Sequence, residues 1–116
     1  MTTQKYNKVK FYLTSAIREL ELSLATLKDR NKDSTVITNY EYWVETLDLT
    51  RSCLYEEINE FYTKTSILEM IRELQGELSN AFRFVHNKLI NNEQKQLASA
   101  WLYCKKAGDE LECAKK

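Results

Sequence analysis

Apolar residues recur at three- and four-residue steps along most of this chain, and the clearest case begins at Ile37. There Thr38 and Glu41 have the spacing of a helix capping box, while Ile37 and Tyr42 have the spacing of a hydrophobic staple. The apolar residues that follow on one helical face are Tyr40, Trp43, Val44, Leu47, Leu54, Ile58 and Phe61. The pattern predicts an amphipathic helix over residues 38–62.

Three further segments carry the same periodicity. Residues 3–28 have a seven-residue apolar repeat, typical of a helix that packs along another helix, at Tyr6, Leu13, Leu20 and Leu27. Residues 66–90 begin at Ser66, with Glu69 in the capping-box position. Residues 93–113 follow Asn91, with Gln94 in the same position. Residues 29–35, between the first two segments, are polar and predict a loop.

Four amphipathic segments with short connections predict an all-α fold, an antiparallel four-helix bundle formed by residues 1–116 as a single domain. The sequence has no proline and only two glycines, which are fewer turn residues than β-rich folds need. Three long helices are the alternative, because neither residues 63–66 nor the pair Asn91 and Asn92 contains a strong helix breaker.

Composition narrows the class of protein. A chain with 43% apolar and 29% charged residues has the balance of a globular domain. No apolar run approaches the roughly 18 residues of a membrane-spanning helix, and the N-terminal residues lack the apolar core of a signal peptide. The cysteines, Cys53, Cys104 and Cys113, form no C-x-x-C pair and indicate free thiols in a reducing compartment. We therefore expect a cytoplasmic protein that contacts no membrane.

The sequence shows no arrangement of catalytic residues. His86 is the single histidine, and no Gly-x-Ser-x-Gly motif or phosphate-binding loop is present. With Arg83 three residues before His86, the Glu-x-x-His pairs of a di-iron bundle are also missing. We expect no enzymatic activity, no cofactor and no metal.

Glu56, Glu57 and Glu60 form the pattern E-E-x-x-E. This pattern resembles the first metal-binding motif of the all-α nucleotide pyrophosphohydrolases of the MazG type, which implies a hydrolase whose helical carboxylates hold magnesium. The E-x-x-D motif of that family has no counterpart in the later helices, where Asp109 and Glu112 stand in the reverse order. The pattern is common in acidic helices, so a solvated acidic helix face explains the three glutamates better, and we prefer that interpretation.

Arg51 lies within the apolar arc of the predicted 38–62 helix, between Leu47 and Leu54. A buried guanidinium needs a counter-charge, so the position predicts a buried ion pair with a carboxylate from another helix. Two alternatives are an anion site inside the bundle and an arginine whose stem covers the core while its head reaches water.

Two apolar strips lie away from the main faces of the first two predicted helices. Phe11 and Leu22 form one strip, and Tyr42, Leu49 and Cys53 form the other. If these helices are antiparallel neighbours, the strips can merge into one candidate interface.

The strips and the lack of catalytic residues favour a non-enzymatic protein–protein interaction module that binds another protein or a second copy of itself. The alternative is a subunit of a nucleoprotein complex. Its nucleic-acid contacts would be Lys5, Lys8, Lys10, Arg18, Lys28, Arg30 and Lys32. The balance of 17 basic against 17 acidic residues does not favour that alternative.

Overall fold

The computed structural model describes the backbone of residues 6–30, 34–54 and 60–114, and the side chains of residues 6–30, 34–54 and 65–113. Four α-helices make up these segments: α2 (Asn7–Asp29), α3 (Ser34–Cys53), α4 (Glu60–Val85) and α5 (Asn91–Ala114). A short 3-10 turn, η1 (His86–Lys88), follows α4. The described segments contain no strand, so the predicted all-α four-helix bundle is confirmed and the three-helix alternative is wrong.

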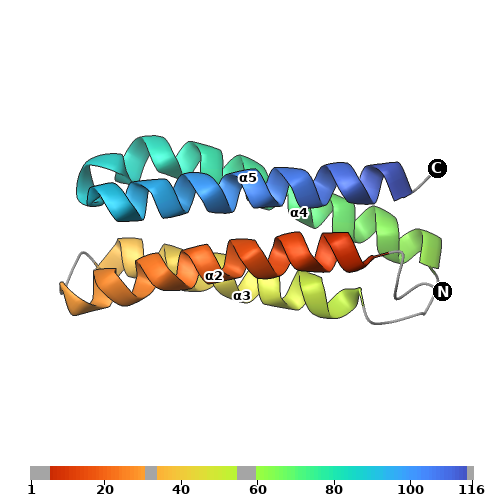
Figure 1. The fold of residues 1–116 in the computed structure, drawn as a ribbon, viewed down its shortest axis with the longest axis horizontal. Coiled ribbons are helices and arrows are strands. Elements are labelled where there is room, and N and C mark those ends of the chain that lie inside the picture. The colour runs from red at the N-terminus through yellow and green to blue at the C-terminus, as the bar shows by residue number, and fades with distance from the viewer. Residues whose placement is uncertain (1–5, 31–33, 55–59, 115–116) are drawn as a thin grey trace.

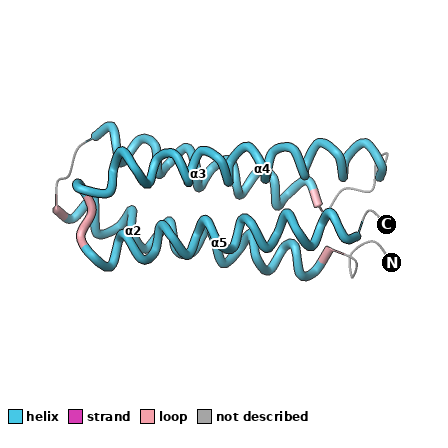
Figure 2. The backbone as a smooth tube through the Cα atoms, turned by 90° about the horizontal axis from the view of Figure 1, so that it is seen from above, coloured by secondary structure: helices cyan, strands magenta, loops and turns pink. Residues whose placement is uncertain are grey.

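The helices run side by side along an elongated molecule of 44 × 20 × 18 Å. In Figure 1, α2 and α5 form the front layer, with α3 and α4 behind them; Figure 2 shows the same two layers from above. Each helix packs on its neighbours in sequence, and α2 also packs on α5, which closes the bundle. Both chain ends lie at the same end of the molecule, as an even number of antiparallel helices requires (Figure 1).

The core is made by the stripes that the sequence pattern predicts. Tyr6, Leu13, Leu20 and Leu27 of the seven-residue repeat are all buried. The facing helices contribute further buried residues, chiefly Tyr40, Trp43, Leu47, Ile67, Ile71, Leu74, Leu78, Leu97, Cys104 and Leu111. Among the described residues, no helix is both long enough and apolar enough to cross a membrane.

The start of α3 differs from the prediction. The helix begins at Ser34, four residues before the predicted cap at Thr38, so Thr38 is an exposed residue inside the helix. Burial of Val36, one turn before Tyr40, explains the extra turn. Glu41 reaches Lys28 of α2 at 3.2 Å instead of closing a capping box.

The break between α3 and α4 also lies earlier than predicted. Helix α3 ends at Cys53, where the amide of Leu54 donates to the carbonyl of Arg51 in a tighter turn. Residues 63–66 and the predicted capping box at Ser66 lie inside α4. Ser66 therefore does not mark a helix start, because the chain is already helical when it reaches that residue.

The start of α5 is shifted by one residue from the predicted cap at Asn91. The amide of Ile90 donates to the carboxylate of Glu93 at 3.1 Å, the reciprocal half of a capping box. Gln94 donates its side-chain amide to the carbonyls of His86 and Leu89. These bonds satisfy backbone groups on both sides of the turn and fix the angle between α4 and α5.

Candidate functional site

An apolar groove lies between α4 and α5 and encloses about 310 Å³. The side chains of Leu78 and Leu97, which are almost completely buried, form its floor, and the half-buried rings of Phe82 and Trp101 form its walls. Ala98 leaves the α5 side open because its side chain is a single methyl group. The groove is a concave surface that can accept an apolar side chain of another molecule.

Helix periodicity places these residues together. Leu78 and Phe82 are four residues apart on α4, and Leu97 and Trp101 are four residues apart on α5, so each pair stacks along one face of its helix. All four lie within the helical segments 66–90 and 93–113 that the sequence predicts. In the fold, Leu78 and Leu97 are buried in the core, whereas the rings of Phe82 and Trp101 are only partly buried.

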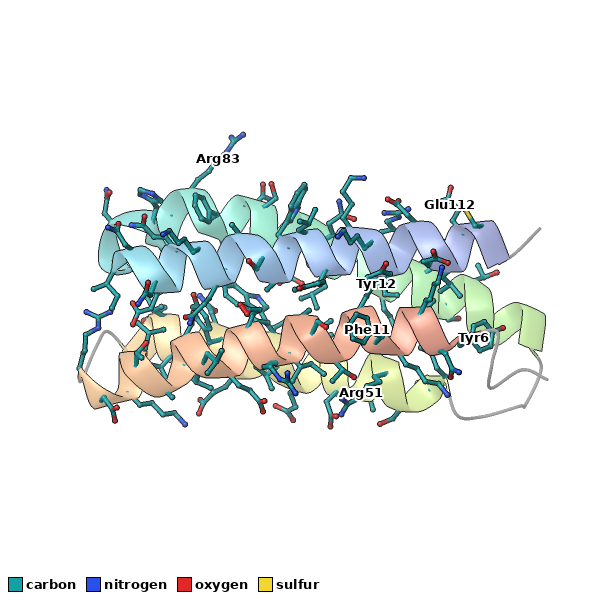
Figure 3. The ribbon with its side chains drawn as sticks, viewed as in Figure 1. Tyr6, Phe11, Tyr12, Arg51, Arg83 and Glu112 are labelled. Atoms are coloured by element: carbon teal, nitrogen blue, oxygen red, sulfur yellow. The ribbon has the colours of Figure 1, made fainter. Side chains whose placement is uncertain are left out.

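Arg83 lines the rim of this groove and is exposed. Figure 3 shows its side chain projecting from α4 away from the bundle. By contrast, Arg72 on the same helix is held by the carboxylates of Asp109 and Glu112. Within the described residues, no acidic side chain pairs with Arg83. The groove therefore combines an apolar interior with an uncompensated positive charge at its edge.

The predicted interface strips are exposed in part. Phe11 is 63% exposed, Leu22 49%, Tyr42 52% and Leu49 62%, whereas Cys53 is half-buried against the core. Helices α2 and α3 are neighbours, as the merging of the strips requires. However, the groove between these helices is lined by other residues, many of them charged: Thr14, Ile17, Arg18, Glu21, Leu24, Glu41, Val44, Glu45, Asp48 and Arg51. The strips therefore do not line this groove, and their merging into one interface stays a prediction.

Phe11 instead belongs to an aromatic cluster on the layer formed by α2 and α5. Its ring packs edge-on against Tyr12, with ring centroids 5.7 Å apart, and Tyr12 stacks on Tyr103 of α5 at 6.4 Å. The ammonium of Lys106 lies 5.9 Å from the centroids of both tyrosine rings. Figure 3 shows Tyr12 turned from α2 toward α5. The cluster forms because α2 packs on α5, and the sequence alone does not show which helices pack on each other.

Among the described residues, Arg51 pairs with a carboxylate of its own helix and not with the predicted one from another helix. Its guanidinium pairs with Asp48, one turn earlier on α3, and donates to the hydroxyl of Thr14 on α2 at 3.0 Å. The side chain is 28% exposed because it lies in the open groove between α2 and α3. A carboxylate of its own helix and a neutral hydroxyl thus satisfy a charge that is only partly removed from water.

A buried polar network between α2 and α5 is the main chemical feature that the sequence interpretation misses. Glu93 is completely buried, and its carboxylate accepts hydrogen bonds from Thr26 and Arg30 near the end of α2 as well as from the amide of Ile90. The signal is present in the sequence, because Glu93 lies four residues before Leu97 on the apolar stripe of α5. A charged residue at a core position needs exactly such partners in another helix.

The network continues toward α3 through Ser23 and Tyr40. Ser23 donates to Gln96 at 2.6 Å. The Tyr40 hydroxyl is buried close to Ser23 and has no hydrogen-bond partner among the described residues. Burial raises the pKa of Tyr40 well above its ordinary value, proximity to Ser23 opposes that rise, and the charge of Glu93 adds to it. The phenol therefore stays neutral, which suits a position inside the core.

The residues of the two alternative functions lie partly outside the described part of the chain. Glu56 and Glu57 lie outside the described residues, as does the side chain of Glu60, and the described part of the chain contains no group of three or more potential metal ligands. Of the basic residues proposed for nucleic acid, Lys28 and Arg30 pair with acidic side chains. Lys8 lies 3.9 Å from Glu110, Lys10 is buried, Arg18 is exposed, and Lys5 and Lys32 fall outside the described residues.

Comparisons with protein-family models, curated proteins and solved structures each find no match to this chain.

Proposed function

We propose that this protein is a non-enzymatic interaction module that binds a partner protein in the groove between α4 and α5. The apolar groove with an arginine at its rim carries the proposal. Aromatic residues and arginine are enriched at the centres of protein interfaces, because they bury large areas and make directional polar contacts. Phe82, Trp101 and Arg83 supply these residue types on one surface.

The bundle holds this surface ready for binding. Phe82 lies in the last turn of α4 and Trp101 lies near the middle of α5, and each stands four residues from a leucine in the core. A preformed surface binds with a smaller loss of conformational entropy than a segment that must fold on contact. In this proposal the protein acts as an adaptor, an inhibitor or an assembly subunit, and its only chemistry is the burial of apolar surface and the pairing of charges.

The test begins by locating the partner. A photo-crosslinking amino acid placed at Ala98 in the native host should form an adduct with the partner, whereas the same group at Ala25, exposed on α2 outside the groove, should not. The purified partner is then titrated against the wild type, Ala98→Arg and Ala25→Arg. Arginine is nearly as good a helix former as alanine, so both variants should keep the wild-type fold.

We expect Ala98→Arg to weaken partner binding by about tenfold or more, a loss of about 1.4 kcal/mol, because the new side chain fills the groove. Ala25→Arg should bind like the wild type. Thermal unfolding of both variants checks that the bundle is intact. Equal affinity of the two variants for the partner would show that the groove is not the docking surface.

A further inference from the structure

We infer that the ligand of the α4–α5 groove is an amphipathic helix that inserts an apolar side chain between Phe82 and Trp101 and places a carboxylate against Arg83. This inference rests on the proposed function, since it specifies the chemistry of the partner at the same surface. The features that carry it are the secondary structure of the groove walls and the charge at its rim.

The groove walls favour a helix over an extended peptide. An extended segment has free backbone amides and carbonyls, and it usually satisfies them at the edge of a sheet. Here every lining residue belongs to α4 or α5, so the backbone groups of the walls bond within each helix, apart from the carbonyls in the last turn of α4. A helix brings its own backbone hydrogen bonds, so only its side chains need to fit the groove. Side-chain ridges of a third helix can then pack between those of α4 and α5.

The charge at the rim selects an acidic partner. Arg83 is exposed and, within the described residues, has no acidic partner, while Phe82 and Leu78 beside it are apolar. A docking helix excludes water from this edge and thereby strengthens the attraction between Arg83 and a nearby carboxylate. A lysine or arginine at the same place would be repelled, so the rim also discriminates against basic helices. The carboxylate should stand three or four residues from the inserted apolar side chain, because that spacing places both on one helix face.

A small molecule and a second copy of the chain are the competing occupants of the groove. The volume of about 310 Å³ lies at the small end of the range for sites that bind small molecules. A second copy would have to present an apolar side chain flanked by an acid. The exposed Leu49 has Glu45 one turn before it, so self-association is a definite alternative outcome of the test.

The experiment is a paired selection from a displayed library of amphipathic helical peptides. Positions three and four residues to either side of one fixed leucine are randomised. Each pool is depleted on an Ala98→Arg form of its own target, so that only binders that need the groove remain. Selection is run in parallel on the purified wild type and on Arg83→Glu. A change of charge at this exposed residue should leave the bundle folded, which thermal unfolding checks.

We expect aspartate or glutamate to be enriched at one randomised position on the wild type, and lysine or arginine at that position on Arg83→Glu. For the best wild-type binder, replacing its acid by lysine should weaken binding to the wild type by about tenfold and restore binding to Arg83→Glu. Added salt should reduce both effects.

Other results would contradict the inference in distinguishable ways. Groove-dependent binders without a charge preference, or with the same preference on both targets, would overturn the acidic helix but keep the docking groove. A pool in which no binder distinguishes the wild type from Ala98→Arg would count against the proposed function itself. Sedimentation of the free protein that reveals a dimer, dissociated by Ala98→Arg but not by Ala25→Arg, would assign the groove to a second copy. If the protein binds decanoate, and Ala98→Arg abolishes that binding while Ala25→Arg does not, the groove would be assigned to a small apolar carboxylate.

Discussion

Gly108 of α5 lies directly against the guanidinium of Arg72 on α4, so that an added β-carbon would stand 2.8 Å from Arg72 Nη1. The guanidinium donates to the carboxylates of Asp109 at 3.0 Å and Glu112 at 2.7 Å. The hydrogen bond to Glu112, together with that to Asp109, raises the pKa of Arg72. Lys105 and Arg72 lower the pKa of Asp109. Because Gly108 has no side chain, the Arg72 guanidinium can lie against the α5 backbone and form this ion-pair network.

The two glycines should therefore respond differently to alanine. Gly76 is exposed in α4 with no neighbouring atom within 4 Å of an added β-carbon, so Gly76→Ala should raise the free energy of unfolding by about 0.5–1 kcal/mol. Gly108→Ala should gain less, because the Arg72 guanidinium must move away from its carboxylates. In an Arg72→Ala background the full gain should return. Denaturant unfolding of the variants measures each change in the free energy of unfolding. An equal increase at both sites in the wild-type background would contradict the close contact between Gly108 and Arg72.

The buried carboxylate of Glu93 should be far more important for stability than an exposed one. Glu93→Ala leaves Arg30 and the amide of Ile90 without their shared acceptor, and we expect it to lower the free energy of unfolding by about 1–3 kcal/mol, because the Arg30 guanidinium can still reach water. Glu112→Ala, which removes an exposed partner of Arg72, is the matched control and should cost about 0–1 kcal/mol. Similar losses in the two variants, measured by urea unfolding, would show that the network does not hold α2 and α5 together.

The apolar stripes of the core could be predicted from the sequence because they depend only on the period of the helix. Leu13, Leu20 and Leu27 are completely buried, as their seven-residue spacing requires. Helix boundaries were predicted less well. Thr38 and Ser66 have the side chains of capping residues, but burial of Val36 extends α3 past the first, and α4 begins before the second. Local capping preferences amount to about 1 kcal/mol, and packing overrides them.

The proposed docking groove could not be predicted in the same way, because it depends on which parts of the apolar stripes of α4 and α5 the packing leaves uncovered. Phe82 and Trp101 belong by periodicity to the core, and only the packing of α4 on α5 shows that their rings border a groove. Glu93 presents the opposite case. Its position on the α5 stripe indicates burial, while its charge argues for the surface, and its partner Arg30 is 63 residues away in the chain. Contacts between residues so far apart in the chain can be predicted only when the arrangement of the helices is known.

The three thiols should react in the order of their exposure. Cys113 is exposed, Cys53 is half-buried and Cys104 is buried, and burial raises the pKa of Cys104 to about 12. A thiol reagent at neutral pH should modify Cys113 first, Cys53 more slowly and Cys104 only when the bundle unfolds. Mass spectrometry of partially modified protein reads out the order. Early modification of Cys104 in the native protein would contradict the packing of α5.

The raised pKa of Cys104 also predicts how stability changes in alkali. Above its ordinary pKa of 9.0, the unfolded chain releases the thiol proton while the folded chain retains it. The unfolded state then binds fewer protons, so the free energy of unfolding should fall as the pH rises from about 9 to about 12. In Cys104→Ala this decline should be shallower, although burial of Tyr40 contributes a fall of the same sign. Identical slopes for the two proteins in urea unfolding across that range would refute this assignment.

The last prediction separates the groove from the exposed strips. Phe11 and Leu49 are 63% and 62% exposed, and neither lines the α4–α5 groove, so Phe11→Glu and Leu49→Glu should each change the free energy of unfolding by less than about 0.5 kcal/mol. Each variant should also bind the groove partner with the affinity of the wild type, whereas Ala98→Arg should not. Calorimetric titration of the three variants with the same purified partner provides the comparison. If Phe11→Glu weakens binding as strongly as Ala98→Arg, the partner also covers the aromatic cluster formed by Phe11, Tyr12 and Tyr103. If Phe11→Glu alone weakens it, that cluster is the docking surface and the groove is not.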